Sequence, residues 1–399
     1  MKRTQTINRT IKYLLINHHT TRVDLHTYLG ISSAAVSNIV KQLIDNNIII
    51  ETGSAISKQE GAGRNKQIIS LNKKIGYYIG VSFTLEGLAV CICNALGEKI
   101  DQQFLDYSSF LNKDINLLII NLVQKLLSKH SDLKVLGIGI AIPGHYNSKD
   151  HKLISNNKMW DMFNLPMIKS YLNLPIIAEN NVESMALARH LFNGDNNIEK
   201  FIFFNIGYGI FASFIDPNNI HPKTNYSVGE IGHSIVKLNG FQCECGKKGC
   251  LQTYISETWL LKKARLLYNL ADNTVIRELV KNINDVTLDT IFKAYKLNDE
   301  YIVNMLNEGM QYLSISISNL LMTYDADTIY LNSPLLQEEP FYSKLLPLIN
   351  EQLRFVNTQK KTKINILKYD KYSGAIGGCA LVAMSELIKD EKYYGIALH

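Results

Sequence analysis

Apolar residues near the N-terminus recur at helical spacing in three short stretches. The repeat that runs from Ile7 to Leu15 predicts a first helix. A second helix is expected to begin at the N-cap residue Thr21 and to end at Gly30, and a third follows Ser32. Two short helices joined by a tight, glycine-containing turn are typical of the helix-turn-helix motif. The pattern therefore predicts such a motif before residue 46.

The third predicted helix turns a polar face outward. This face carries small, amide and basic side chains, which are Ser33, Ala34, Ser37, Asn38 and Lys41. The second helix of a helix-turn-helix enters the major groove of DNA, where small side chains approach the base edges and an amide such as Asn38 can pair with adenine. We therefore predict that these five residues contact DNA.

A β-hairpin is expected after the third helix. Two predicted strands, Ile48–Ile50 and Gln67–Ile69, flank a polar loop that ends in Gly61-Ala62-Gly63-Arg64. Such a wing has a cationic tip, and Arg64 is predicted to enter a narrow minor groove. The alternatives are that the helices and hairpin form a protein-interaction domain, and that Arg64 is a solvated loop charge.

Charge is unevenly distributed along the 399 residues, whose formal net charge is +6. Residues 1–74 hold eleven lysines and arginines against four acidic residues, a net charge of +7, which leaves −1 for the remainder. A basic head on a nearly neutral body is expected of a DNA-binding module joined to another domain.

From about Gly76 the pattern changes to alternating strands and helices. Such alternation predicts α/β architecture in which helices cover both faces of the sheet, and the length suits two lobes with a ligand cleft between them. The predicted strands are Tyr77–Val81, Leu88–Cys93, Val135–Ile142, Ile176–Ala178, Phe201–Ile206 and Phe211–Ile215, and the predicted helices are Ile115–Lys129, Val182–Phe192 and Leu251–Asn269.

One histidine and three cysteines lie close together in the second half of the chain, in GEIGH (residues 229–233) and CECGKKGC (residues 243–250). Three thiolates and an imidazole favour tetrahedral zinc, and glycines allow the loop to fold tightly. Buried free cysteines and a catalytic metal are the alternatives, but four protein ligands leave no position for water. The predicted ligands of a structural Zn²⁺ are His233, Cys243, Cys245 and Cys250.

These two segments, with a winged helix ahead of them, resemble the ROK family of repressors, open reading frames and kinases. The resemblance spans essentially the whole chain. It implies two actin-like α/β lobes of the sugar-kinase and ribonuclease H-like type, behind a winged helix-turn-helix that the kinases lack. The expected domains are residues 1–75 for the winged helix-turn-helix, 76–192 completed by 377–399 for the first lobe, and 193–376 for the second lobe with its zinc loop.

The positions that serve phosphate transfer in ROK kinases are altered in this chain. The resemblance places the catalytic base at Asn181, and an amide cannot accept a proton near neutral pH. The first phosphate loop, Asp-x-Gly-Gly-Thr in the kinases, is replaced by Val81-Ser82-Phe83-Thr84-Leu85, where bulky Phe83 is expected to block the approach of phosphate to the backbone. The second phosphate loop and the adenine region also depart from the kinase pattern, at residues 206–211 and 331–334. The protein is therefore expected not to be an enzyme.

At the sugar-binding positions, this chain matches the pattern of the family more closely than at the phosphate-binding positions. The resemblance implies that a sugar is held by Asn180, Asn181, Glu230, His233 and Gln252. Asn181 and Gln252 carry amides where the family usually has carboxylates, which changes the specificity or weakens the binding. Further predicted cleft residues are Pro143-Gly144-His145 and Asn156-Asn157. For each polar residue taken alone, a structural role explains the sequence equally well.

Together with these patterns, the resemblance implies a repressor of a sugar operon, similar to the xylose, glucose-response and N-acetylglucosamine repressors. It would bind a palindromic operator in double-stranded DNA as a homodimer or a tetramer, and respond to xylose or another mono- or disaccharide. The alternative is a regulator controlled by a protein partner of sugar transport; a sugar kinase is disfavoured, and activation in place of repression stays open. The first ten residues contain no apolar stretch and no apolar run is long enough to span a membrane, so the cytoplasm is the expected location and no membrane partner is expected.

Overall fold

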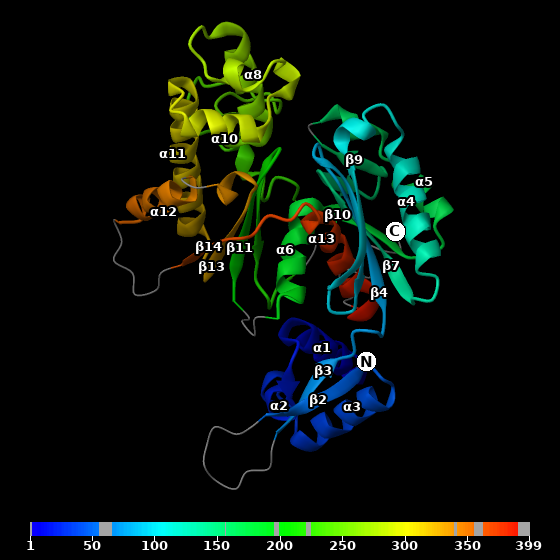
Figure 1. The fold of residues 1–399 in the computed structure, drawn as a ribbon. Helices are drawn as coiled ribbons and strands as arrows, with labels where there is room; N and C mark the ends of the chain where they lie inside the picture. Colours follow the sequence, from blue (N-terminus) through cyan, green and yellow to red (C-terminus); the bar gives the residue numbers. More distant parts are fainter. Residues whose placement is uncertain are drawn as a thin grey trace. The chain divides into compact units, whose positions relative to one another are not determined.

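The computed structural model of the protein describes residues 2–55, 66–155, 157–194, 199–220, 225–338, 341–354 and 362–389. The chain forms two compact units, residues 1–198 with 371–399 and residues 199–370 (Figure 1). The expected domain bounds remain a prediction, and a boundary at 376/377 would fall inside helix α13 (Ser373–Val382). None of the helices in the described ranges combines the length and the apolar character that crossing a bilayer requires.

The first unit begins with three helices and a small antiparallel sheet. The helices are α1 (Lys2–Asn17), α2 (Arg22–Leu29) and α3 (Ser33–Asp45); the strands are β1 (Thr20–Thr21), β2 (Ile49–Ala55) and β3 (Lys66–Leu71), in the order β1-β3-β2. The predicted ends of α2 are confirmed. Thr21 and Asp24 form a reciprocal capping box at its start, and Gly30 adopts the left-handed conformation at its end. The small core between these elements includes Leu15, Leu25 and Ile69.

A five-stranded mixed sheet forms the centre of the first unit. Its order is β10-β7-β4-β5-β6, with β4 (Tyr77–Phe83), β5 (Gly87–Asn94), β6 (Lys99–Asp106), β7 (Val135–Ile142) and β10 (Ile176–Asn180). The β4–β7 and β7–β10 pairs are parallel, whereas β4–β5 and β5–β6 are antiparallel. Strand β6 was not predicted, because half of its residues face solvent and its sequence lacks a continuous apolar run.

Helices cover both faces of this sheet (Figure 1). On one face α4 (Ile115–Lys129) and α5 (Leu165–Tyr171) enclose an apolar core with Ile79, Val81 and Ile140. On the other face α13 and α6 (Asn181–Phe192) pack against the strands and against each other. The remaining elements are the hairpin β8 (His145–Asn147) and β9 (Lys152–Ile154), the 3-10 turns Tyr107–Ser109 and Lys158–Met162, and a π-helical turn at Ala383–Leu387.

The second unit is built on a four-stranded sheet of order β12-β11-β13-β14. The strands are β11 (Phe201–Ile206), β12 (Ile210–Ile215), β13 (Thr328–Asn332) and β14 (Lys363–Ile366). The helices are α7 (Gln252–Ile255), α8 (Glu257–Leu270), α9 (Ile276–Leu279), α10 (Leu288–Lys296), α11 (Glu300–Thr323) and α12 (Phe341–Gln352), with 3-10 turns at Ile231–His233, Ile283–Asp285 and Leu335–Gln337. The predicted single helix over 251–269 is wrong: it is broken at Ser256, whose hydroxyl caps α8 by accepting from the amide of Trp259.

Candidate metal centre and sugar-site residues

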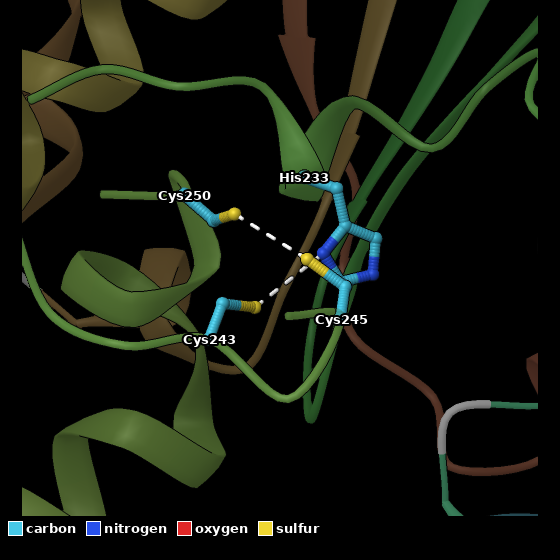
Figure 2. Close-up of side chains that lie close together, drawn as sticks. All are labelled: His233, Cys243, Cys245 and Cys250. Atoms are coloured by element: carbon cyan, nitrogen blue, oxygen red, sulfur yellow. Dashed lines mark hydrogen bonds between the residues drawn. The ribbon is translucent and has the colours of Figure 1, made fainter. Parts of the chain in front are cut away.

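Four side chains in the second unit turn their ligand atoms toward one point (Figure 2). The Nδ1 atom of His233 lies 3.5 Å from Sγ of Cys243, and Sγ of Cys245 lies 3.6 Å from Sγ of Cys250. All four ligand atoms are within 4.8 Å of one another. An ion bound tetrahedrally at about 2.3 Å from each sulfur would space its ligands about 3.8 Å apart. The four predicted ligands therefore form a set that could hold one tetrahedral metal ion.

The protein backbone holds this loop in place. His233 ends the 3-10 turn Ile231–His233, and the amide of Cys243 donates to the carbonyl of Lys247 at 2.8 Å. Gly246 and Gly249 both have positive φ angles, 88° and 75°. A Cβ on Gly249 would lie only 1.7 Å from the carbonyl oxygen of Lys237, so only glycine fits there.

The electrostatics of the loop keep the imidazole neutral. Burial lowers the pKa of His233, and the Glu230 carboxylate opposes this only in part. Burial also raises the pKa of Cys250, and the neighbouring Cys245 thiol raises it further. A neutral imidazole can coordinate at once, whereas the thiols must lose protons when a metal binds, so binding is coupled to proton release.

His233 also faces Glu230. Its Nε2 atom lies 3.9 Å from Oε2 of Glu230, while Nδ1 is directed at the thiols. The His233 side chain is only 12% exposed and that of Glu230 is 32% exposed. One residue thus links the metal cluster to a predicted sugar-binding carboxylate through its two ring nitrogens.

Gln252 supports the metal loop. It is the first residue of α7, and its Nε2 atom donates to Sγ of Cys243 at 3.5 Å and to Oε2 of Glu244 at 3.4 Å. The indole of Trp259 donates to the same carboxylate oxygen at 3.2 Å. The sequence analysis did not predict these contacts with the Cys243 sulfur and the Glu244 carboxylate. The available signal was the short spacing from Cys250 to Gln252, which keeps Gln252 close to the metal loop.

Asn180 caps a helix. Its Oδ1 atom accepts from the amides of Val182 and Glu183 at the start of α6, and its Nδ2 atom donates to the carbonyl of Gly144. The side chain is buried, at 3% exposure, and Asn181 beside it is half-buried. Asn180 therefore fixes the Pro143–His145 loop against α6. Asn156, another predicted cleft residue, lies outside the described residues.

The Phe83 side chain does not lie where the sequence predicted it. The Phe83 ring is fully buried in the apolar core, 5.0 Å from the Trp160 ring and 5.2 Å from the Phe163 ring between centroids. Its bulk therefore points into the core, and the expectation that it blocks phosphate at the backbone is wrong. The segment still has neither the acidic residue nor the glycine pair of the kinases.

The polar face of α3 is exposed as predicted. The exposed residues include Ser33, Ala34, Ser37, Asn38 and Lys41. The opposite face, with Val36, Ile39, Val40 and Leu43, is buried. Arg64 lies outside the described residues.

Comparison with known proteins places the fold in the class of two-lobed, actin-like sugar kinases and their regulators. The sequence profile of the ROK family matches residues 78–385, and the chain belongs to this family. The xylose repressor of Caldicellulosiruptor bescii is 25% identical over 393 residues, covering 96% of each chain.

Solved structures that share the fold include a regulator and a kinase. A ROK family transcriptional regulator, described as a homologue of the Escherichia coli MLC protein, superposes with a TM-score of 0.73 at 19% identity and covers 99% of both chains. A ROK family glucokinase from Streptomyces griseus, in complex with glucose and AMPPNP, gives a TM-score of 0.61 at 18% identity and covers 77% of this chain and 99% of its own. The likeness to the regulator extends over the N-terminal part of the chain as well as the lobes.

Proposed function

We propose that the protein is a sugar-responsive transcriptional repressor of the cytoplasm whose N-terminal winged helix-turn-helix binds a palindromic operator. One observation carries the proposal: the exposed face of the helix that would read DNA carries small, polar and charged side chains and no large apolar one, in a chain that aligns with a xylose repressor over 96% of its length. A helix that used this face to dock a partner protein would expose larger apolar residues there. Residues Ser33, Ala34, Ser37, Asn38 and Lys41 would contact the major groove, and Arg64 the minor groove.

The effector in this proposal is a sugar, xylose or another mono- or disaccharide. Asn181, Glu230 and His233 would bind its hydroxyl groups, with Asn180 and Gln252 placing the loops around it. Amides and carboxylates suit this role because a sugar hydroxyl both donates and accepts hydrogen bonds. A sugar that binds one arrangement of the lobes more tightly than another would shift the population of that arrangement and change the affinity for the operator.

The metal in this proposal is a structural Zn²⁺ on His233, Cys243, Cys245 and Cys250. Zinc takes sulfur and nitrogen ligands in a tetrahedron, and four protein ligands leave it no open position. Bound zinc would supply a rigid cross-link in the loop. It would thereby fix the imidazole of His233 and the carboxylate of Glu230 relative to each other.

No phosphate transfer is expected. An amide at position 181 cannot serve as the base, and the segment Val81–Leu85 lacks an acid for the magnesium ion of a nucleotide. A coupled assay with ATP and a panel of hexoses and pentoses should therefore show no turnover.

Selection from random duplexes tests the DNA-binding part of the proposal. The full-length protein should enrich one palindromic sequence, because a homodimer or a tetramer presents two reading helices related by a two-fold axis. Calorimetry with a panel of sugars tests the other part. Heat from one of them supports a sugar effector, and a folded protein that binds none would favour control by a partner protein of sugar transport.

A further inference from the structure

Three more cysteines gather in the first unit. Cys91 and Cys93 are two residues apart on β5, so their side chains share one face of the sheet, and Cys379 comes from α13. The Cys91 sulfur lies 3.9 Å from the Cys93 sulfur and 3.9 Å from the Cys379 sulfur, and all three sulfurs are within 4.8 Å of one another. Each side chain is 0% exposed. We name these residues the thiol triad.

Glycines hold the triad together. Gly80 lies opposite Cys91 in the β4–β5 pair, and a Cβ there would lie 1.7 Å from the carbonyl oxygen of Ala375 and 2.8 Å from Sγ of Cys379. Nearby, a Cβ on Gly139 would lie 1.9 Å from the carbonyl oxygen of Gly378. Because these glycines have no side chain, the backbone of α13 packs directly against the strands. The three sulfurs are therefore held in place before any ligand binds, which lowers the entropy that binding would cost.

The donor set of the triad is sulfur alone. Within the described parts of the chain no imidazole or carboxylate joins this group, whereas the metal loop includes His233. Thiolates without oxygen or nitrogen ligands select soft ions such as Cu(I). A metal ion in the plane of three sulfurs, about 2.3 Å from each, would space them about 4.0 Å apart. Two separations in the triad already have nearly this value.

The number of ligands favours Cu(I) over Zn²⁺. A closed zinc site almost always has four ligands in a tetrahedron, whereas the triad offers three sulfurs and, within the described parts of the chain, no fourth His, Cys, Asp or Glu ligand.

From this geometry we propose that the thiol triad binds a single Cu(I) ion through the sulfurs of Cys91, Cys93 and Cys379. Three copper–sulfur bonds form as the three S–H bonds break, the three protons pass to solvent, and no electron is transferred because the ion arrives as Cu(I). Since the sulfurs are fully buried, α13 must move briefly from the sheet to admit the ion, and uptake is slow. This site is separate from the metal loop and from the proposed repressor function.

The test loads the full-length, zinc-containing protein without oxygen, using Cu(I) buffered by bicinchoninate. Copper and zinc per chain are measured after desalting, and X-ray absorption at the copper edge identifies the ligands. The expected result is one copper per chain with the zinc retained, and three sulfur ligands at about 2.3 Å without nitrogen. Nitrogen in the shell, or zinc lost as copper enters, would place the copper in the metal loop and overturn the proposal.

Variants give an independent answer. Cys91→Ala and Cys379→Ala should each abolish copper retention while zinc content and the melting curve are kept, and Cys250→Ala should lose zinc but keep the copper. Copper uptake unchanged in the first two variants would contradict the proposal, as would wild-type protein that takes no copper from the buffer. If either alanine variant fails to fold, the wild-type ligand shell and zinc content still decide the question.

Discussion

The side-chain amide of Gln252 donates a hydrogen bond to the sulfur of Cys243 across 3.5 Å. A residue expected to bind sugar thus contacts a predicted metal ligand directly. Hydrogen bonds to a thiolate disperse its negative charge and fix its direction, which makes such a partner part of the metal site. In the proposed function, the sugar response and the metal site therefore depend on some of the same residues.

Replacing Gln252 by alanine should weaken zinc binding by about ten-fold, because the Cys243 sulfur and the Glu244 carboxylate both lose a donor. Competition with a chromophoric zinc chelator measures the affinity. Gln352→Ala, at an exposed position on α12, is the matched control. Equal zinc affinity in the two variants would show that the amide does not support the loop.

Two glycines of the metal loop should differ sharply in their tolerance of a methyl group. Gly249→Ala forces a Cβ against the Lys237 carbonyl and should abolish zinc retention, whereas nothing lies within 4 Å of a Cβ on Gly246. Gly246→Ala keeps only the strain of its positive φ, about 1 kcal/mol, and should retain zinc. Zinc content after dialysis compares them, and equal zinc loss in both variants would be inconsistent with this loop geometry.

Two substitutions on α3 should weaken DNA binding in different ways. Lys41→Ala should lower the affinity for all sequences and reduce the slope of log affinity against log salt by about 1, as expected for a lost phosphate contact. Asn38→Ala should cost about 1–3 kcal/mol on the selected site and little on random duplex. Lys125→Ala, at an exposed position on α4, is the control. Wild-type affinity and salt slope in both α3 variants would exclude this helix as the reading element.

His190 should make stability depend on pH. Its pKa falls to about 3 because burial penalises the charged ring and Lys12 repels it, and its Nε2 atom has no hydrogen-bond partner within the described chain. The imidazole of the unfolded chain has a pKa of about 6.5. Below that pH the unfolded state therefore binds a proton that the folded state does not bind. Stability is therefore lost as the pH falls from about 6.5 towards 3, by about 2 kcal/mol at pH 5.

Urea unfolding at pH 7.5, 6 and 5 measures this loss. His190→Gln should flatten the dependence over that range, and His151→Gln, at an exposed position, should leave it unchanged. A pH dependence identical in His190→Gln and wild type would assign the effect to other groups.

The sequence predicted the elements whose signal is local. The Thr21 cap and Gly30 stop of α2 are encoded within ten residues, and the four metal-loop ligands lie within eighteen. Prediction from the sequence failed where contacts between distant parts of the chain determine the structure. Helix α11, with 24 residues, is a separate omission, because its buried residues Ile302, Leu306, Leu313 and Ile317 recur at helical spacing and could have been predicted. The role of Gln252 and the meeting of Cys379 with Cys91 also depend on chain folding that no short pattern records.

The most direct test of the central claim is operator affinity measured by fluorescence anisotropy, with and without sugar, at a fixed moderate salt concentration. The account predicts that the protein prefers one promoter fragment over random duplex, and that one sugar weakens this binding by about 5–150-fold, the range of a typical coupling free energy. Equal affinity for every promoter fragment and for random duplex would contradict the account.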